Sequence, residues 1–448
     1  MDKIRVGYVA LSKTSFDIVL AQETYEQSIA SVRALANVEP LIFDGVVATM
    51  DDAERASAFF EAQRPDLLII QCATFHIGSL PQIITRHVTA PLVLWGVPEP
   101  PMNGEHLRAN SLCAINMDAS TFKKTGRKYT TLFGAPDDPE TIKELSTICS
   151  ATAVVKTLAA SRIGLVGYHV PGFQDLAFDE TALKRDFGLD ILHIDIAEVL
   201  DRAENAPAAD VRKTVAEMDA SAKRENVDEA MLEKSARLYL ALMEIAHNNN
   251  LAGLAVKCWP EFQNLFGIFV CSTLGKLNDA GLLCSCEGDV GGLMTMMMQA
   301  WLVKTPVFFA DFIATDPEEN TGIAWHCGSA PWTFAATSDD VKLRIYRGGV
   351  RGIAAEFPMR PGQVTMARLS FSPEGYRMLL ETGTALETEL IVRGNPMKIK
   401  FDHNVQRILN AILDNGVEHH FSIVYADLTR VLTRVCTLLN IPLINTAV

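Results

Sequence analysis

The segment that most constrains the fold is residues 282–311, LLCSCEGDVGGLMTMMMQAWLVKTPVFFAD. Its pattern predicts a short strand over residues 282–286, a helix rich in Met and Leu over 293–302, and a second strand over 307–310. Pro306 ends the helix, because the residue before a proline avoids helical backbone. A strand, a helix and a strand in this order predict two parallel strands of one sheet joined by a crossover.

Each of these two strands ends in an acidic residue, Glu287 and Asp311. Parallel neighbours point their C-terminal ends the same way, and ligands bind at that edge of the sheet. A single acid after a strand is commonly no more than a helix cap or a loop residue. Two acids in consecutive units, the first inside Glu-Gly-Asp at 287–289, instead favour a site for a hard divalent cation.

The rest of the chain extends this pattern into a domain prediction. A chain of 448 residues exceeds one ordinary core. Strand and helix patterns alternate up to about residue 155 and again after it, whereas short alternating runs separated by turns follow residue 331. We therefore predict an α/β protein with two doubly wound parallel-sheet domains, residues 1–158 and 159–330, of which the second carries the acids. A C-terminal antiparallel, β-barrel-like domain with a terminal helix is predicted for residues 331–448.

The expected strands of the C-terminal region can be placed from the alternation of apolar and polar residues between turns. They cover residues 341–346, 352–357, 364–371, 376–381, 386–392 and 421–425.

Charge and composition exclude several classes of function. Forty basic and 54 acidic side chains give a net charge of −14, which argues against nucleic acids and anionic membranes as partners. A small anionic substrate remains compatible, because a few local cations suffice. No window approaches the ~18 uninterrupted apolar residues of a membrane span, and the N-terminus lacks the pattern of a signal peptide. Nine scattered cysteines, mostly in apolar runs, indicate reduced thiols, so we expect a cytoplasmic protein.

The phosphate-binding patterns are missing. No Gly-x-Gly-x-x-Gly follows the first predicted strand and no P-loop pattern occurs, so the fingerprint of an NAD-dependent oxidoreductase is absent.

Histidines are the usual nitrogen partners of two carboxylates in a site for Mn²⁺, Co²⁺ or Mg²⁺. His326, in Trp-His-Cys-Gly, and the pair His419 and His420 are the candidates. The alternative for His326 is a structural histidine with a satisfied hydrogen bond. Adjacent residues of a strand point to opposite faces, so at most one of His419 and His420 is expected to face a given site.

Two further segments offer side chains that can contact a sugar. Lys257, Trp259 and Glu261 follow a predicted strand, where ligands of such sheets bind. Arg108 and Asn110 combine a cation with an amide in a loop next to another strand end, although that loop can equally serve only to cap the next helix.

At these residues the sequence resembles the L-fucose isomerases and their shorter relatives. The resemblance rests on Glu-Gly-Asp at 287–289, Gly292, the Met-rich helix and Phe-Ala-Asp at 309–311. The separation of the two acids, 311 − 287 = 24, equals that of the family's two acidic metal ligands. Near the end, counting back from Ile-Pro at 441–442 puts the family's metal-binding histidine on His420, with His419 one position away.

The resemblance implies a homo-oligomeric aldose–ketose isomerase that uses Mn²⁺ or a similar ion such as Co²⁺ or Mg²⁺. It assigns Glu287 and Asp311 as metal ligands, one or both of which transfer the proton, and His420 as the nitrogen ligand. Moving a carbonyl from C1 to C2 requires proton transfer through an enediolate, which a cation stabilises. A dimer, trimer or hexamer is expected. The candidate sugar contacts are Lys257, Trp259, Glu261, Asp289, His326, Arg108, Asn110 and His419.

The identity of the sugar stays open at this point. The main expectation is a pentose, a 6-deoxyhexose or a modified hexose. The first alternative is an isomerase or epimerase of an anionic sugar, for example a sulfonated one, which Arg108 or Lys257 at the sugar's far end would favour. The second is a non-catalytic sugar-binding protein, which would not need Glu287, Asp311 and His420 to converge.

Overall fold

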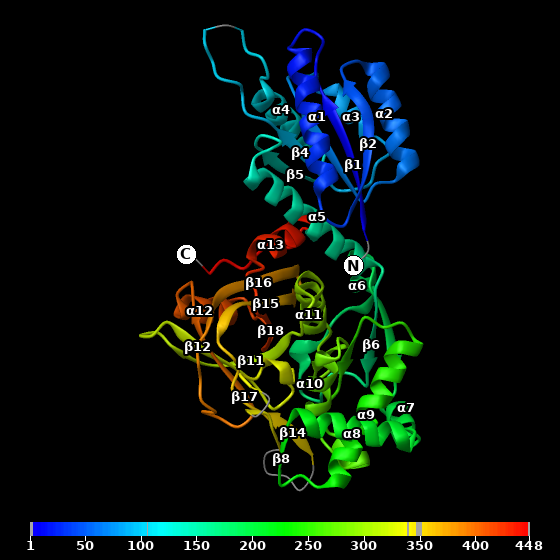
Figure 1. Cartoon of the computed structure of the whole chain (residues 1–448), viewed down its shortest axis with the longest axis vertical. Coiled ribbons are helices and arrows are strands. Elements are labelled where there is room, and N and C mark those ends of the chain that lie inside the picture. Colours follow the sequence, from blue (N-terminus) through cyan, green and yellow to red (C-terminus); the bar gives the residue numbers. More distant parts are fainter. Residues whose placement is uncertain (1–2, 105, 338–339, 346–351, 447–448) are drawn as a thin grey trace. The chain divides into compact units, whose positions relative to one another are not determined.

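The computed structural model describes residues 3–104, 106–337, 340–345 and 352–446 (Figure 1). The contacts divide the chain into two units. Unit 1 comprises Met1–Thr157 with Thr437–Leu439, and unit 2 comprises Leu158–Cys436 with Asn440–Val448. Among the described residues, no helix has the length and apolar character that crossing a membrane requires.

In the described part of unit 1, five strands form a parallel sheet in the order β2-β1-β3-β4-β5. The strands are β1 (Ile4–Leu11), β2 (Val38–Val47), β3 (Leu67–Cys72), β4 (Leu92–Gly96) and β5 (Tyr129–Phe133). The helices are α1 (Ile18–Ala34), α2 (Met50–Gln63), α3 (Ser79–Ile84), α4 (Ser111–Lys124) and α5 (Pro139–Ala159).

Strand β3 shows why helices cover both faces of this sheet. Successive side chains of a strand point to opposite faces, so a strand that is apolar throughout must be buried on both. Leu68 and Ile70 pack with residues of α2, α3 and α4, whereas Leu67 and Ile69 pack with residues of α1 and α5. The expected doubly wound parallel sheet is therefore confirmed for this part of the chain.

Unit 2 begins with a second parallel sheet, in the order β10-β9-β6-β7. Its strands are β6 (Arg162–Val166), β7 (Asp190–Ile194), β9 (Gly253–Val256) and β10 (Leu283–Cys286). Its helices are α6 (Glu180–Phe187), α7 (Ile196–Glu204), α8 (Ala208–Ser221), α9 (Glu229–Asn248), α10 (Cys271–Asp279) and α11 (Val290–Val303). Short helical turns are η1 (Gln174–Leu176), η2 (Phe262–Phe266) and η3 (Trp332–Phe334).

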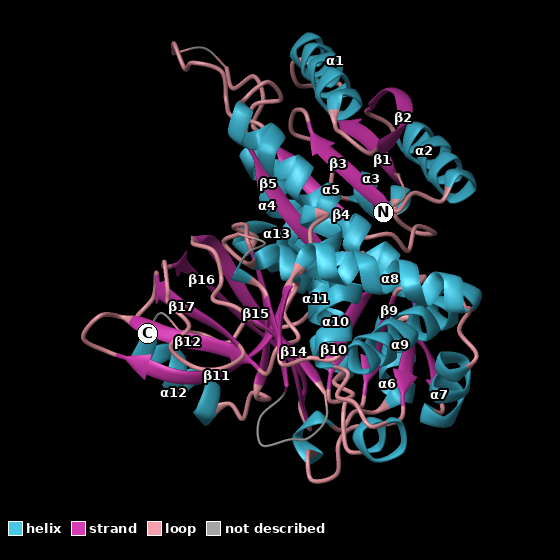
Figure 2. Cartoon of the chain, turned by 60° about the horizontal axis from the view of Figure 1, so that its bottom comes forward, coloured by secondary structure: helices cyan, strands magenta, loops and turns pink. Residues whose placement is uncertain are grey.

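A closed antiparallel barrel follows in the same unit, in the order β11-β12-β17-β16-β15-β18. Its strands are β11 (Phe308–Asp316), β12 (Thr321–His326), β15 (Gly362–Ser372), β16 (Gly375–Ala385), β17 (Asn395–Phe401) and β18 (His420–Val424). A small sheet contains β8 (Lys223–Glu225), β13 (Lys342–Ile345) and β14 (Ile353–Glu356), and the last helices are α12 (Val405–Asp414) and α13 (Thr429–Leu439). Figure 2 shows the barrel strands grouped on the left, and helix α11 contacts β11, β15 and β18 of the barrel. The predicted barrel is thus confirmed, while the three-domain division at residues 158 and 330 stays a prediction.

The expected pairing of the two strands in residues 282–311 is wrong. β10 is an edge strand of the parallel sheet, but β11 pairs antiparallel with β12 and β18 of the barrel. Helix α11, which connects β10 to β11, contacts β9 and β10 of the parallel sheet and also β15 and β18 of the barrel. It is buried without interruption from Val290 to Gln299, as a helix enclosed between a sheet and a barrel must be.

One predicted strand of the C-terminal region is also wrong. Residues 386–392 form no strand. The strand that follows β16 is β17, which pairs with β12 from Asn395 to Lys400. The alternation of apolar and polar residues suggested a strand over 386–392. However, β16 continues to Ala385, and the residues after it form the connection to β17. The runs at 364–371 and 376–381 are confirmed as the hairpin β15–β16, and those at 341–346 and 352–357 correspond to β13 and β14. Tyr346 lies outside the described residues.

Candidate active site

Glu287 stands in a tight turn between β10 and α11. Its φ is 64° and that of Gly288 is 76°, so two successive residues have left-handed backbone. For Glu287 this costs about 1–2 kcal/mol, a strain that is typical of functional sites. Gly288 cannot be replaced without movement, because a Cβ there would lie 2.3 Å from the carbonyl oxygen of Tyr168. The carbonyl oxygen of Glu287 accepts a hydrogen bond from the Val170 amide at 3.2 Å, so the loop after β6 supports the turn.

Asp311 reaches the same place from the barrel. It lies within β11 directly opposite His420 of β18, and cross-strand neighbours share a face of the sheet. The Nε2 atom of His420 is 3.5 Å from Oδ1 of Asp311 and 3.4 Å from Oε2 of Glu287. The two acids therefore meet around His420, although they do not lie at the tips of adjacent parallel strands as expected.

A buried ion network holds His420 in place. Its Nδ1 is 3.0 Å from Oδ2 of Asp289, and Asp289 pairs at 2.5 Å with Arg368 of β15. Arg368 also pairs with Glu418 at 3.3 Å, and Asp289 caps α11 by accepting from the Gly292 amide. Burial opposes ionisation of Asp289, but Arg368 and His420 outweigh it and hold its pKa well below the usual range. Asp289 is thus an ionised partner that fixes the orientation of the imidazole.

At His420, in contrast to Asp289, the effect of burial on the pKa is not outweighed by the charged neighbours. Burial lowers the pKa of this imidazole in spite of Asp289, so the ring is neutral at neutral pH. With Nδ1–H donating to Asp289, the lone pair of Nε2 faces Glu287 and Asp311.

His419 approaches the same carboxylate, which corrects the expectation that only one of the two histidines would do so. Its Nε2 is 3.3 Å from Oε2 of Glu287, and its Nδ1 is 2.6 Å from Oδ2 of Asp175. The alternation rule fails because β18 begins at His420 and His419 belongs to the bend before it. Burial opposes protonation of His419, but the bonds with Glu287 and Asp175 outweigh it and raise its pKa to about 9.

These donors fit a divalent cation of the Mn²⁺ type. The possible ligand atoms lie close together: one atom from each of Glu287, His419 and His420 lies within 4.8 Å of the others. Asp311 adds a carboxylate next to His420. Ligands held at right angles about 2.1 Å from an ion lie about 3 Å apart. The separations of 3.4 and 3.5 Å around His420 Nε2 are close to that spacing. Carboxylate oxygens with one neutral imidazole are the donor set that such ions accept.

Three of the predicted sugar contacts lie together at the end of β9. Lys257 pairs with Glu261 at 2.6 Å, and its side chain is mostly buried. The Gly288 amide donates a hydrogen bond to the carbonyl of Val256, the residue before Lys257. This bond places Lys257 next to the turn that contains Glu287. Trp259, 37% exposed, lies with its ring centroid 6.1 Å from that of Phe173, which in turn lies 5.3 Å from that of His419.

His326, the last residue of β12, is buried beside the cluster. Its ring stacks on that of His420 with centroids 5.8 Å apart. Its Nδ1 is 2.9 Å from the Cys327 amide and 3.0 Å from the hydroxyl of Ser329, whereas Nε2 has no partner among the described residues. The alternative of a strand-end histidine with a satisfied hydrogen bond agrees with the contacts of Nδ1, and contact of the unpartnered Nε2 with a sugar stays a prediction.

Arg108 and Asn110 belong to unit 1, and their contacts lie there. Arg108 pairs with Asp17 at 2.8 Å. Asn110 precedes α4, and its backbone N–H donates a hydrogen bond to the carboxylate of Glu99 at 2.6 Å. Contact of either residue with a sugar stays a prediction.

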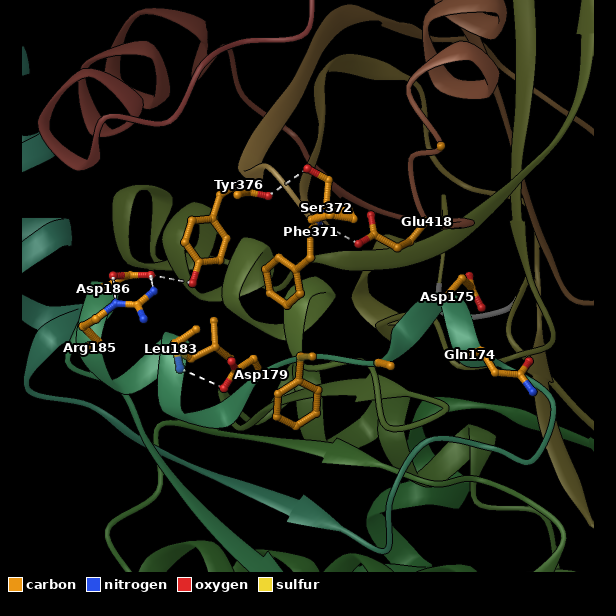
Figure 3. A pocket seen from close by; sticks show the side chains of 16 residues that line it. Gln174, Asp175, Asp179, Leu183, Arg185, Asp186, Phe371, Ser372, Tyr376 and Glu418 are labelled. Carbon is orange, nitrogen blue, oxygen red and sulfur yellow. Dashed lines mark hydrogen bonds and ion pairs between the residues drawn. The ribbon is translucent and has the colours of Figure 1, made fainter.

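Sequence reasoning missed Asp175, Arg368 and Glu418. An arginine between apolar neighbours in a barrel strand, as in Val-Thr-Met-Ala-Arg-Leu, is a signal that could have indicated Arg368. Asp175 offered none, because it lies in a short helical turn of the loop after β6. Both Asp175 and Glu418 also line a pocket of about 720 Å³, together with Tyr376, Phe371 and Asp186 (Figure 3). The pocket therefore adjoins the residues that support His419 and Arg368, and not the two acids themselves.

Sulfoquinovose isomerases from several bacteria are similar to nearly the whole chain. That of Alkalicoccus urumqiensis is 27% identical over 99% of this chain and 99% of its own length. That of Priestia aryabhattai is 27% identical, covering 98% and 99%. That of Clostridium sp. (strain MSTE9) is 28% identical, covering 95% and 96%. The expectation of an aldose–ketose isomerase is thereby confirmed: the chain is an enzyme of this class. None of these relatives is called an L-fucose isomerase, so that resemblance stays a prediction.

Other comparisons add little. No family model matches the chain. A periplasmic solute binding protein of an ABC transporter from Actinobacillus succinogenes 130z, with bound D-allose, is 9% identical and covers 68% of this chain and 93% of its own. Its TM-score of 0.18 carries no argument about the fold.

Proposed function

We propose that this enzyme is a metal-dependent aldose–ketose isomerase of an anionic, sulfonated hexose such as sulfoquinovose. The observation that carries the proposal is the position of His420 Nε2, 3.4 and 3.5 Å from the carboxylates of Glu287 and Asp311. The sulfonated substrate, which the amino-acid sequence left open as an alternative, is supported by the names of the full-length relatives. A neutral pentose or 6-deoxyhexose has no such support.

Glu287, Asp311 and His420 would hold the ion, Mn²⁺ or else Co²⁺ or Mg²⁺. When bound, such an ion polarises the sugar carbonyl and stabilises the negative charge of an enediolate. Asp289, through Nδ1 of His420, keeps the Nε2 lone pair directed at the two acids. The proposal includes the binding of this ion and the assembly of the enzyme as a homo-oligomer.

Glu287 and Asp311 are the groups that can transfer the proton. In the forward reaction a carboxylate takes the proton from C2 of the aldose and returns it to C1, while the hydroxyl proton of C2 moves to the oxygen of C1. Burial raises the pKa of Glu287, but His419 and His420 outweigh it and the net effect is a lowered pKa. Glu287 is therefore ionised at neutral pH and able to accept a proton. Either acid fits this role.

The test of the substrate follows isomerisation by NMR with Mn²⁺ present. Sulfoquinovose is expected to form its ketose faster than 6-deoxyglucose, which has the same ring without the sulfonate, and faster than L-fucose. One charge-assisted hydrogen bond to the sulfonate is worth about 1.5–3 kcal/mol, or about ten- to a hundredfold in kcat/KM. Equal or preferred turnover of the neutral sugars would overturn the anionic substrate. Binding of sulfoquinovose without any turnover would support the non-catalytic alternative instead.

Removal of divalent ions is expected to stop the reaction. Enzyme treated with EDTA and desalted should lose its activity, and added Mn²⁺ should restore it, because the charge on the enediolate then lacks its counter-ion. A sample taken through the same desalting steps without chelator serves as the control. Full activity in enzyme whose metal content is confirmed to be negligible would contradict the proposed metal dependence.

Lys257 is the cation of unit 2 that we expect to bind the sulfonate. Lys257→Met should lower kcat/KM for sulfoquinovose by about ten- to a hundredfold, because a charge-assisted hydrogen bond is lost. Activity on 6-deoxyglucose should change little, and this separates recognition of the anion from loss of the pair with Glu261. The matched control is Lys234→Met, since Lys234 bonds the carbonyl of Phe266. An equal loss on both sugars would remove Lys257 from this role.

A further inference from the structure

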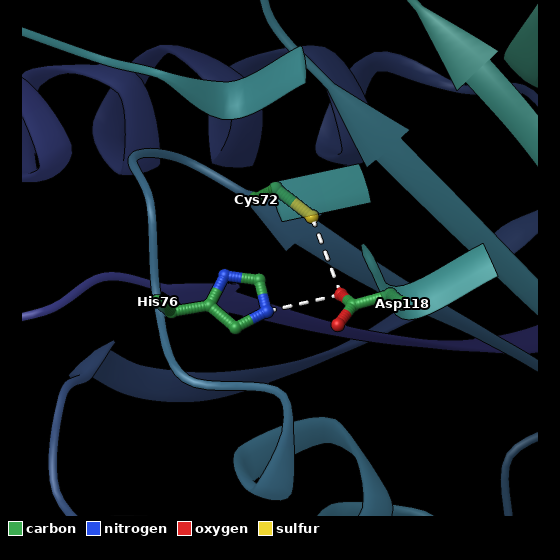
Figure 4. A group of neighbouring side chains, drawn as sticks. All are labelled: Cys72, His76 and Asp118. Atoms are coloured by element: carbon green, nitrogen blue, oxygen red, sulfur yellow. Dashed lines mark hydrogen bonds and ion pairs between the residues drawn. The ribbon is translucent and has the colours of Figure 1, made fainter. Parts of the chain in front are cut away.

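Unit 1 contains a second cluster of metal-ligating side chains: Cys72, His76 and Asp118 (Figure 4). Cys72 is the last residue of β3, His76 follows in the next loop, and Asp118 lies in the middle of α4. Unlike the ligands proposed for Mn²⁺, this set combines one thiol, one imidazole and one carboxylate. Nothing in the proposed isomerase reaction uses it.

Asp118 occupies a position of α4 at which an apolar residue is expected. Ala114 and Phe122, one turn before and one turn after it, both belong to the apolar core of the sheet. Side chains four residues apart share one face of a helix, so Asp118 points into this core. Its side chain and those of His76 and Cys72 are all 0% exposed. A carboxylate at such a position is costly unless a positive charge compensates it.

The compensation that the protein itself supplies is incomplete. Oδ2 of Asp118 is 3.0 Å from Nε2 of His76 and 3.6 Å from Sγ of Cys72. Oδ1 of Asp118 and Nδ1 of His76 have no partner in the described part of the chain. Within the same range, the one ion pair of Asp118 is that with His76.

Asp289 shows what full compensation looks like in the same protein. It is equally buried, but it pairs with Arg368 and His420 and also accepts from a backbone amide. Asp118 has no arginine and no backbone donor among its described contacts. Asp118 therefore has fewer partners than Asp289, and its Oδ1 is available to a cation.

The two separations from Asp118 Oδ2 are close to those around a tetrahedral zinc ion. With Zn–S of about 2.3 Å and Zn–N and Zn–O of about 2.0 Å, tetrahedral angles put S and O about 3.5 Å apart and N and O about 3.3 Å apart. The observed separations are 3.6 Å and 3.0 Å. A thiolate, a carboxylate and a neutral imidazole also sum to two negative charges, so Zn²⁺ makes the buried group neutral. The thiolate favours Zn²⁺ over Mn²⁺ or Mg²⁺.

We propose that Cys72, His76 and Asp118 bind a Zn²⁺ ion that ties helix α4 to strand β3, with a water molecule as the fourth ligand. On binding, the Cys72 thiol loses its proton to solvent and its sulfur forms the bond to the ion; no oxidation or reduction takes place. Because the ligands come from a strand end, a loop and a helix, the ion joins segments up to 46 residues apart. The bound ion therefore stabilises unit 1.

The test measures zinc in the full-length, untagged protein produced in zinc-supplemented medium and then dialysed against EDTA. Wild type is expected to retain about one Zn²⁺ per chain, and Cys72→Ala to lose it. Cys149→Ala is the matched control, since Cys149 is another buried cysteine of unit 1, on α5, and should keep the ion. Retention of zinc by a folded Cys72→Ala variant would overturn the proposal.

A second measurement decides the outcome even if Cys72→Ala fails to fold. X-ray absorption of zinc in the wild type should show one sulfur at about 2.3 Å and nitrogen or oxygen ligands at about 2.0 Å. Cys258, Cys286 and Glu287 form the competing thiol group of unit 2, and zinc held there would show two sulfurs. Folded wild type that carries no zinc, or zinc with two sulfur ligands, would show that the Cys72 cluster is only a hydrogen-bonded group.

Discussion

Replacing Glu287 by Gln is expected to abolish turnover while the protein stays folded. The substitution keeps the shape of the side chain but removes a charge that faces His419 and His420 and a proton acceptor. Loss of a general base costs about 10²–10⁴-fold, and loss of a metal ligand adds to this. Steady-state kcat on sulfoquinovose, with saturating Mn²⁺, measures the effect. The midpoint of thermal unfolding should stay within a few degrees, because no core packing changes.

The matched control for this variant is Glu319→Gln. Glu319 is an exposed acid of the same unit that pairs with Lys398, so its replacement should leave kcat unchanged. Wild-type turnover by the Glu287→Gln enzyme would rule out Glu287 both as a ligand and as the proton carrier. Loss of activity together with loss of folded structure would instead assign it a structural role in its left-handed turn.

Arg368→Met is expected to be the most destabilising single change in unit 2. It leaves the carboxylates of Asp289 and Glu418 buried without the guanidinium that they share. Breaking a buried ion pair in this way costs about 3–5 kcal/mol. Calorimetry should therefore show a lower unfolding temperature for the transition of unit 2. Activity should fall as well, because the loss of Arg368 weakens the hold of Asp289 on His420.

Arg377→Met serves as the control for this prediction. Arg377 bonds Asn415 and not a carboxylate, so its replacement leaves no buried charge behind and should cost about 1 kcal/mol or less. The double variant Arg368→Met with Asp289→Asn should recover part of the lost stability, since one of the two uncompensated charges is then gone. Equal unfolding temperatures for Arg368→Met and wild type would contradict a stabilising role of this ion network.

The predicted site residues show that periodicity and spacing can identify candidate site residues without giving the correct pairing of the strands that carry them. Glu287 and Asp311 stand out in the sequence because acids end two apolar runs, and the structure does bring them to one histidine. The reason assumed for their proximity, two parallel neighbours in one sheet, was wrong. Alternation also misplaced the strand after β16, because a run of alternating residues does not say whether any strand lies beside it.

The amino-acid sequence by itself determined the first parallel sheet, the existence of the barrel and the residues around which a site can form. Each of these follows from local patterns of apolar side chains, which report burial residue by residue. Only the tertiary structure decided that β11 joins the barrel, that Asp289 and Arg368 fix His420, and that Asp118 meets Cys72 and His76. The partners in these contacts are 42 to 131 residues apart in the chain. Which distant strand or charge meets which is set by the packing of the whole unit, and no short segment contains that information.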